Sequence, residues 1–183
     1  GYYLIVGAMR DDAIRGSGIP ALYLTVGFSL FWVGLEKIIY PRWGLYVLET
    51  NPQLTLGLSS EFFLVAAAFI ELALGYLLII GLLGRPLGLV ITLVFFTTTL
   101  VFGKTEVIGH TLIHAALLVF LIEGPGTAYP TPIAIHRRLP WRMAFAAVNF
   151  VIILVVLMVP YAFMAQSEFE HAVSENVQQA QIE

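Results

Sequence analysis

The sequence has no cysteine and few charged residues. Asp, Glu, Lys and Arg together make up 11% of its 183 residues, and the formal net charge is -3. The lack of cysteine excludes disulfides, thiolate metal ligands, iron-sulfur clusters and thiol nucleophiles. Because the few charges are scattered and slightly acidic, no basic surface for nucleic acid is expected either.

Apolar residues dominate the composition of the chain. Hydrophobic residues account for 59% of the chain, and the mean hydropathy is +0.89. A soluble domain of this length could not bury so much apolar surface, so the lipid bilayer must be its solvent. We therefore predict an all-α, polytopic integral membrane protein.

Five apolar segments can be assigned to membrane spans, which require about 17 to 25 residues each. The third and fourth are short, and they reach a sufficient length if one begins at Arg85 and the other near Thr105, with Gly103 capping the third. The five segments are residues 19–39, 62–83, 87–102, 107–122 and 143–165.

These spans define the expected domain organisation, a four-helix transmembrane bundle followed by a fifth, C-terminal transmembrane helix. The start of the chain is apolar but too short to span, and we interpret it as an interfacial segment or as what is left of a processed end. The expected parts are the interfacial segment 1–18, the bundle 19–126, a cytoplasmic loop 127–142, the fifth helix 143–165 and an acidic external tail 166–183.

The basic residues predict the orientation of the spans. With five spans, one side of the membrane carries Arg10, Arg15, Arg85, Arg137, Arg138 and Arg142, and the other carries Lys37, Arg42 and Lys104. Cytoplasmic loops carry the excess of Lys and Arg, so we expect a cytoplasmic N-terminus and an external C-terminus.

Glu71 is the only charged residue between positions 62 and 83. An acidic side chain at the centre of a bilayer costs roughly 2.5 to 3.5 kcal/mol, which favours a functional role and a nearby partner. At a rise of about 1.5 Å per residue, Glu71 and His114 lie at similar depths below the same membrane surface. We therefore predict that His114 is the partner of Glu71 and that the two are catalytic.

Further polar residues extend this predicted site toward the outer surface. Glu106, His110 and His114 are spaced at i, i+4 and i+8, so they share one face of a helix. Glu36 and Lys37 end the first span on the same side. We predict that Glu106, His110, Glu36 and Lys37 bind a substrate. The alternative is that these polar side chains only satisfy one another and hold the helices together.

The residue types leave three chemistries to compare. A haem with two histidine ligands is the least favoured, because ligands one turn apart on one helix cannot reach opposite faces of the macrocycle and His136 and His171 lie outside the spans. A metal site is the less favoured alternative, since the sequence lacks the His-Glu-x-x-His and paired Glu-x-x-His patterns. A quinone or small polar substrate held by histidine and carboxylate is preferred. No haem, flavin or cluster motif is present, so any redox cofactor would be on another chain.

Two patterns outside the site also carry expectations. Several glycines in the first three spans predict close helix approach although no GxxxG motif occurs: Gly27, Gly34, Gly75, Gly81 and Gly88. The segment 40–58 is expected to be a loop whose aromatic residues Tyr40, Trp43 and Tyr46 belong to an interfacial belt.

Four short motifs in order give the chain a family resemblance. They are GLEKIIYP at 34–41, IELALG at 70–75, GLLGR at 81–85 and GPG at 124–126. In these motifs and their spacing, residues 28–126 resemble the DoxX-like membrane proteins. The resemblance implies a bacterial or archaeal four-helix bundle with Lys37, Glu71 and Arg85 at characteristic positions. Some similar proteins, such as the DoxD subunit of thiosulfate:quinone oxidoreductase, belong to quinone-linked enzymes.

The sequence thus predicts an inner-membrane subunit of a quinone-linked redox complex rather than a self-sufficient enzyme. Its quinone or small-substrate pocket would lie between the second and fourth spans, where Glu71 and His114 would hold the head group. The alternative is a non-catalytic accessory subunit that packs against other membrane subunits through the fifth helix and the tail. A small transporter is less favoured because no inverted repeat is evident.

Overall fold

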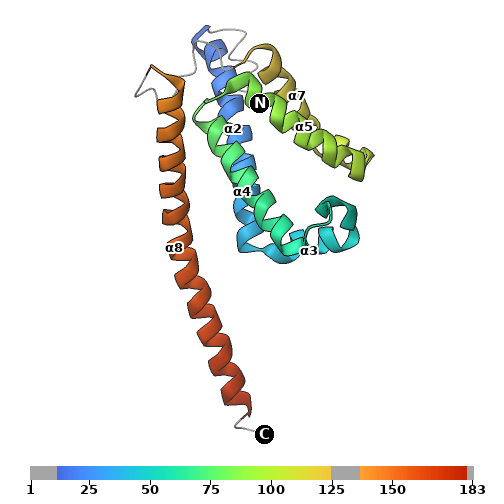
Figure 1. The fold of residues 1–183 in the computed structure, drawn as a ribbon, viewed down its shortest axis with the longest axis vertical. Coiled ribbons are helices and arrows are strands. Elements are labelled where there is room, and N and C mark those ends of the chain that lie inside the picture. The colour runs from blue at the N-terminus through green and yellow to red at the C-terminus, as the bar shows by residue number, and fades with distance from the viewer. Residues whose placement is uncertain (1–11, 125–136, 181–183) are drawn as a thin grey trace. The chain divides into compact units, whose positions relative to one another are not determined.

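The fold is all-helical throughout the part of the chain that the computed structural model describes, residues 12–124 and 137–180 (Figure 1). The chain divides into two compact units, Gly1–Ile135 and His136–Glu183, each of which is described by itself. The helices of the first unit are α2 (Asp12–Ile39), α3 (Pro41–Thr50), the 3-10 helix η1 (Pro52–Thr55), α4 (Ser60–Ile79), α5 (Gly84–Phe102), α6 (Lys104–Gly109) and α7 (Thr111–Ile122). The second unit contains α8 (Leu139–Ala180).

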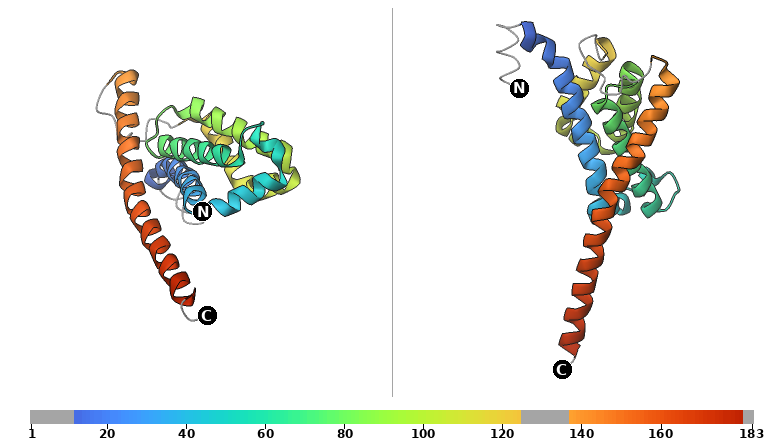
Figure 2. Two further views of the ribbon diagram at one scale, coloured as in Figure 1. Left: turned by 60° about the horizontal axis from the view of Figure 1, so that its bottom comes forward. Right: turned by 90° about the vertical axis from the view of Figure 1, so that its left-hand side faces the viewer.

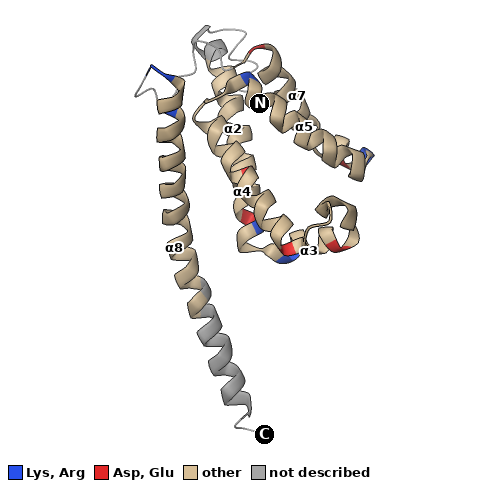
Figure 3. Cartoon of the chain, in the orientation of Figure 1, with Lys and Arg blue, Asp and Glu red and all other residues tan. Residues whose placement is uncertain are grey.

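Among the described residues, four helices are long and apolar enough to cross a membrane, and by length and composition they indicate a multi-pass membrane protein. In Figure 3 the coloured charged residues of the described chain lie mostly near helix ends, and long stretches between them are uncharged. The four candidate spans are Ser17–Ile39, Ser60–Ile79, Gly84–Phe102 and Leu139–Met164. A fifth span is not confirmed.

The expected span 107–122 is divided into the short helices α6 and α7, which corrects the prediction of one continuous helix. The backbone leaves helical geometry at His110, where φ is -110° and ψ is 17°. Gly109, next to the break, favours it because glycine has a low helix propensity. The Thr111 hydroxyl donates to the carbonyls of Val107 at 2.7 Å and Ile108 at 3.1 Å. The helix also begins one residue before Thr105, after the predicted cap of α5 at Gly103.

Helices α2 and α4 pack against each other backbone to backbone. A Cβ atom added at Gly75 would lie 2.5 Å from the Phe31 nitrogen, and one added at Gly34 would lie 2.8 Å from the Ala68 carbonyl oxygen. Gly27 is equally close to the Gly75 carbonyl. Small residues allow such contact between membrane helices, so the predicted close approach is confirmed here. The two views in Figure 2 also show the two helices side by side.

Helices α5 and α7 form a second pair. A Cβ atom at Gly88 would lie 3.2 Å from the Phe120 Cβ atom, so these helices are also closely packed. At their end, Arg85 Nη2 donates a hydrogen bond of 2.7 Å to the carbonyl oxygen of Ile122 in the last turn of α7. A guanidinium there satisfies an otherwise free carbonyl and complements the negative end of the helix dipole. Arg85 therefore has a structural role.

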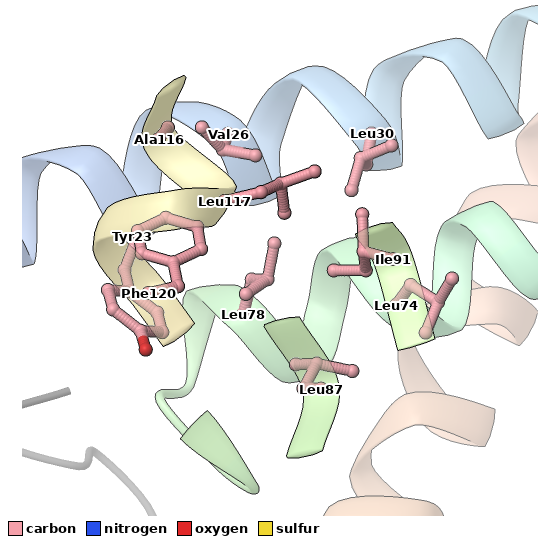
Figure 4. Packing of buried hydrophobic residues seen from close by; sticks show 10 residues of the cluster. All are labelled: Tyr23, Val26, Leu30, Leu74, Leu78, Leu87, Ile91, Ala116, Leu117 and Phe120. Carbon is pink, nitrogen blue, oxygen red and sulfur yellow. The ribbon is translucent and has the colours of Figure 1, made fainter. Parts of the chain in front are cut away.

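One apolar cluster joins the two helix pairs near the α4–α5 turn (Figure 4). Tyr23 and Phe120 are fully buried and their ring centroids lie 4.0 Å apart. The cluster consists of Tyr23, Val26, Leu30, Leu74, Leu78, Leu87, Ile91, Ala116, Leu117 and Phe120. In Figure 1 the α5–α7 pair diverges from the α2–α4 pair with distance from this turn. Lys37, Thr98 and Glu106 lie toward the ends of the helices that diverge.

The segment 40–58, expected to be a loop, contains α3 and η1. Pro41 at the first position of α3 favours a helix start there, because proline has no amide hydrogen to leave unpaired. Leu48 is buried, whereas Tyr40, Trp43 and Tyr46 are exposed. Their location in an interfacial belt stays a prediction.

Helix α8 is longer than the expected fifth span at both ends. It begins at Leu139, inside the expected loop, and continues to Ala180 through most of the expected tail. Residues 161–180 contain no glycine or proline and many good helix formers, which explains the extension. The rest of the loop at 125–136 and the end of the chain at 181–183 lie outside the described residues, as does the start of the interfacial segment.

Candidate functional site

Glu71 forms an ion pair with Lys37. The Lys37 Nζ atom lies 2.6 Å from Glu71 Oε2, and the two side chains are 25% and 23% exposed. The glycine contacts between α2 and α4 bring the last turn of α2 alongside the middle of α4, which places the two residues within reach. An ammonium group beside a carboxylate compensates the cost of its charge in apolar surroundings.

The partner of Glu71 is thus Lys37 rather than His114, which corrects the sequence prediction. Equal depth of two Cα atoms along the membrane normal does not decide which side chains meet. Lysine has a long flexible side chain that can place its charge more than a helical turn from its own backbone. Lys37 was expected in the substrate site but not in contact with Glu71.

A second polar cluster joins α5 to α6. The Thr98 hydroxyl donates to Glu106 Oε1 at 2.8 Å, and His110 Nδ1 lies 3.4 Å from the same oxygen and 3.3 Å from the Glu106 carbonyl oxygen. The predicted common face of Glu106 and His110 is therefore confirmed, even though the helix breaks at His110. Thr98 was not predicted as a site residue. The predicted helix end at Gly103 contained the signal, because a short connection there between antiparallel helices places residues 98 and 106 opposite each other.

His114 is in a different environment. Its Nε2 atom is buried and has no hydrogen-bond partner, and its ring meets the edge of Phe95 at a centroid distance of 5.8 Å. The ring of His110 also contacts Phe95, at 5.3 Å. Phe95 thus packs against both histidines, but only His110 shares a cavity with Glu71.

A cavity of about 520 Å³ lies between the two helix pairs. Both polar clusters contribute to its wall: Lys37 and Glu71 from the α2–α4 pair, and Thr98, Glu106 and His110 from the helices across from it. The remaining wall is almost entirely apolar. Ligand pockets typically measure about 300 to 1,000 Å³ and combine apolar walls with a few placed polar groups. A cavity thus lies in the region where the sequence predicts a pocket, and its role in binding a substrate stays a prediction.

Two of the predicted site residues do not line this cavity. Glu36 is exposed and lies outside it, although Lys37 lines it. Adjacent residues on a helix point about 100° apart, and here Lys37 faces the cavity while Glu36 does not. His114 lies one turn beyond His110 and is also outside the wall.

The side chains of the described residues that could ligate a metal ion do not form a metal centre. Within the described ranges, no group of three or more His, Asp or Glu side chains is placed to hold a metal ion. The cavity offers hydrogen bonding instead. Lys37 is a donor with hydrogens beyond the one it gives to Glu71. When His110 is neutral and its Nδ1 hydrogen faces Glu106, its Nε2 atom is an acceptor.

The fold and the cavity together define a multi-pass helical membrane protein with polar groups enclosed among its apolar helices. Comparison of the chain with family models, with curated proteins and with solved structures finds no match.

Proposed function

We propose that this protein is a bacterial inner-membrane subunit of a quinone-linked redox complex and that its cavity binds a quinone or a similarly small amphipathic substrate. The observation that carries the proposal is the pairing of two polar clusters across one apolar cavity. Lys37 with Glu71 forms one wall, and Glu106 with His110 and Thr98 forms the other.

The chemistry of a quinone head group suits these two walls. Its carbonyl oxygens accept hydrogen bonds, which Lys37 can donate. The reduced form carries hydroxyl groups, which can donate to His110 Nε2 when the His110 Nδ1 hydrogen faces Glu106. Because the sequence has no haem, flavin or cluster motif, electrons would come from a cofactor on another subunit.

The Lys37–Glu71 ion pair also supports the resemblance to DoxX-like proteins. Two of the three residues at that family's characteristic positions contact each other, and the third, Arg85, joins α5 to α7. The proposal includes five spans, with α6 and α7 together completing the fourth and α8 forming the fifth. The distribution of basic residues supports a cytoplasmic N-terminus and a periplasmic C-terminus.

A second candidate function is that of a non-catalytic accessory subunit, with polar clusters that only hold helices together. It is favoured by α8, which belongs to a separate compact unit and has an uncharged apolar stretch followed by a helical acidic extension. Such a helix suits contact with another membrane subunit.

Equilibrium binding of decyl-ubiquinone to the full chain in lipid nanodiscs separates the two functions. Lys37→Met should weaken binding about 10- to 100-fold, because a hydrogen bond from a charged donor to the quinone carbonyl contributes about 1.5 to 3 kcal/mol. The matched control is Lys104→Met, which removes an exposed ammonium group outside the cavity.

The control variant should bind like the wild-type protein, and circular dichroism should show the same helix content in all variants. Wild-type protein that does not bind the quinone, or a Lys37→Met variant that binds it unchanged, would contradict the proposal. The accessory function would then be preferred.

A further inference from the structure

A second cavity of about 530 Å³ lies between α2 and α7. Its wall includes Leu22 and Val26 from α2 and Leu112, Ala115 and Val119 from α7. Thr25 also lines it, but the Thr25 hydroxyl donates to the Ala21 carbonyl of its own helix at 2.8 Å. The cavity therefore offers apolar contacts and almost no free hydrogen-bonding groups.

This apolar cavity is a neighbour of the polar one. Ser29 and Ile113 line both cavities. Ser29 is on α2 and Ile113 on α7, so the two residues mark the boundary from opposite helices. A molecule that extends past this boundary would have its polar part near His110 and its apolar part between α2 and α7.

From the two shared lining residues we infer that the ligand has a hydrocarbon tail and that the tail lies in the cavity between α2 and α7. The inference rests on the proposed function, because the polar cavity is taken as the site of the head group. The ligand is then a lipid-soluble molecule with a small polar ring and one apolar chain. The alternative occupant is an acyl chain of the surrounding bilayer, which would not be connected to anything in the polar cavity.

The tail gains little from leaving lipid, since lipid is as apolar as the cavity wall. Its contribution comes from close packing and from holding the head group in one orientation. Filling the cavity should therefore produce a moderate loss that is confined to ligands with a tail. Ala115 suits this test because its side chain is exposed and lines only the apolar cavity, so a larger residue does not disturb the core.

The test compares two probes, decyl-ubiquinone and the tail-less ubiquinone-0, on the full chain in nanodiscs. Ala115→Phe should weaken binding of decyl-ubiquinone about tenfold and leave binding of ubiquinone-0 within twofold of wild type. The matched control is Ala147→Phe, an exposed alanine in the apolar part of α8. Val119→Phe, at another position in the same cavity, provides a second variant if the first does not fold.

Each other outcome overturns the inference. An unchanged affinity for both probes would mean that bilayer acyl chains, and not the ligand, occupy the cavity. An equal loss for both probes would mean that the substitution acts on the head-group site. If wild-type protein binds ubiquinone-0 and its binding depends on Lys37, the proposed function stands even where the tail inference fails. If it binds neither probe, both are wrong.

Discussion

The Lys37–Glu71 ion pair provides the sharpest test of the fold. Glu71→Gln removes the carboxylate charge at nearly constant volume, and Lys37→Met removes the ammonium charge at similar length. The double variant removes both charges together. A comparison of the three with wild type gives the interaction free energy of the pair, separate from the other effects of each substitution.

The exposure of the pair sets the expected magnitude. Exposed ion pairs contribute about 0.2 to 1 kcal/mol, whereas removal of one partner of a buried pair costs about 3 to 5 kcal/mol. At 25% and 23% exposure the pair lies between these limits. We expect a coupling free energy of about 1 to 2 kcal/mol, with the double variant less destabilised than the sum of the single variants.

The two single variants should also differ in size. In Glu71→Gln, Lys37 lies in the last turn of α2 and can turn its ammonium group toward the interface. In Lys37→Met, Glu71 stays in the middle of α4 and cannot reach water as easily. Lys37→Met should therefore lower the free energy of unfolding more than Glu71→Gln does. The difference between the two losses should be about 1 kcal/mol.

Reversible unfolding in mixed micelles of increasing SDS content, followed by circular dichroism, measures these free energies. Lys104→Met and Glu49→Gln are the controls, because both remove exposed charges outside the pair and the cavity. The reasoning would be refuted if the coupling free energy were below about 0.3 kcal/mol, because substitutions at independent sites add to within about that value. A larger loss for Glu71→Gln than for Lys37→Met would refute the proposed asymmetry.

Two further predictions concern helix packing and use the same unfolding measurement. Gly75→Ala should cost about 1 to 3 kcal/mol, because the new Cβ would lie 2.5 Å from the Phe31 nitrogen and backbone atoms cannot yield easily. Gly18→Ala, with open space around its Cβ position, should be neutral or stabilising, and equal losses at both sites would contradict the packing argument. Arg85→Met should cost about 1 to 2 kcal/mol by leaving the Ile122 carbonyl without its donor. Arg85→Lys should recover part of that loss, and full tolerance of Arg85→Met would show that water replaces the bond.

Several features could be predicted because they depend on local composition. The helices of the first three expected spans follow from hydropathy, and the glycine contacts between α2 and α4 follow from small residues in apolar helices. The i, i+4 spacing was enough to bring Glu106 and His110 together. The break at His110 was missed, because hydropathy averages over a window and does not register the low helix propensity of the single residue Gly109.

The sequence by itself determined that the chain is helical, that its apolar helices suit a membrane, and that Glu71 needs a partner. These conclusions depend on the cost of transferring each residue type into lipid, which is a property of the residue and its neighbours in the chain. Only the tertiary structure decided that the partner is Lys37, that Glu36 and His114 lie outside the cavity, and that Thr98 belongs to the site. Those outcomes depend on the rotation of each helix about its axis and on the reach of single side chains, which are decided by the packing of the helices against one another.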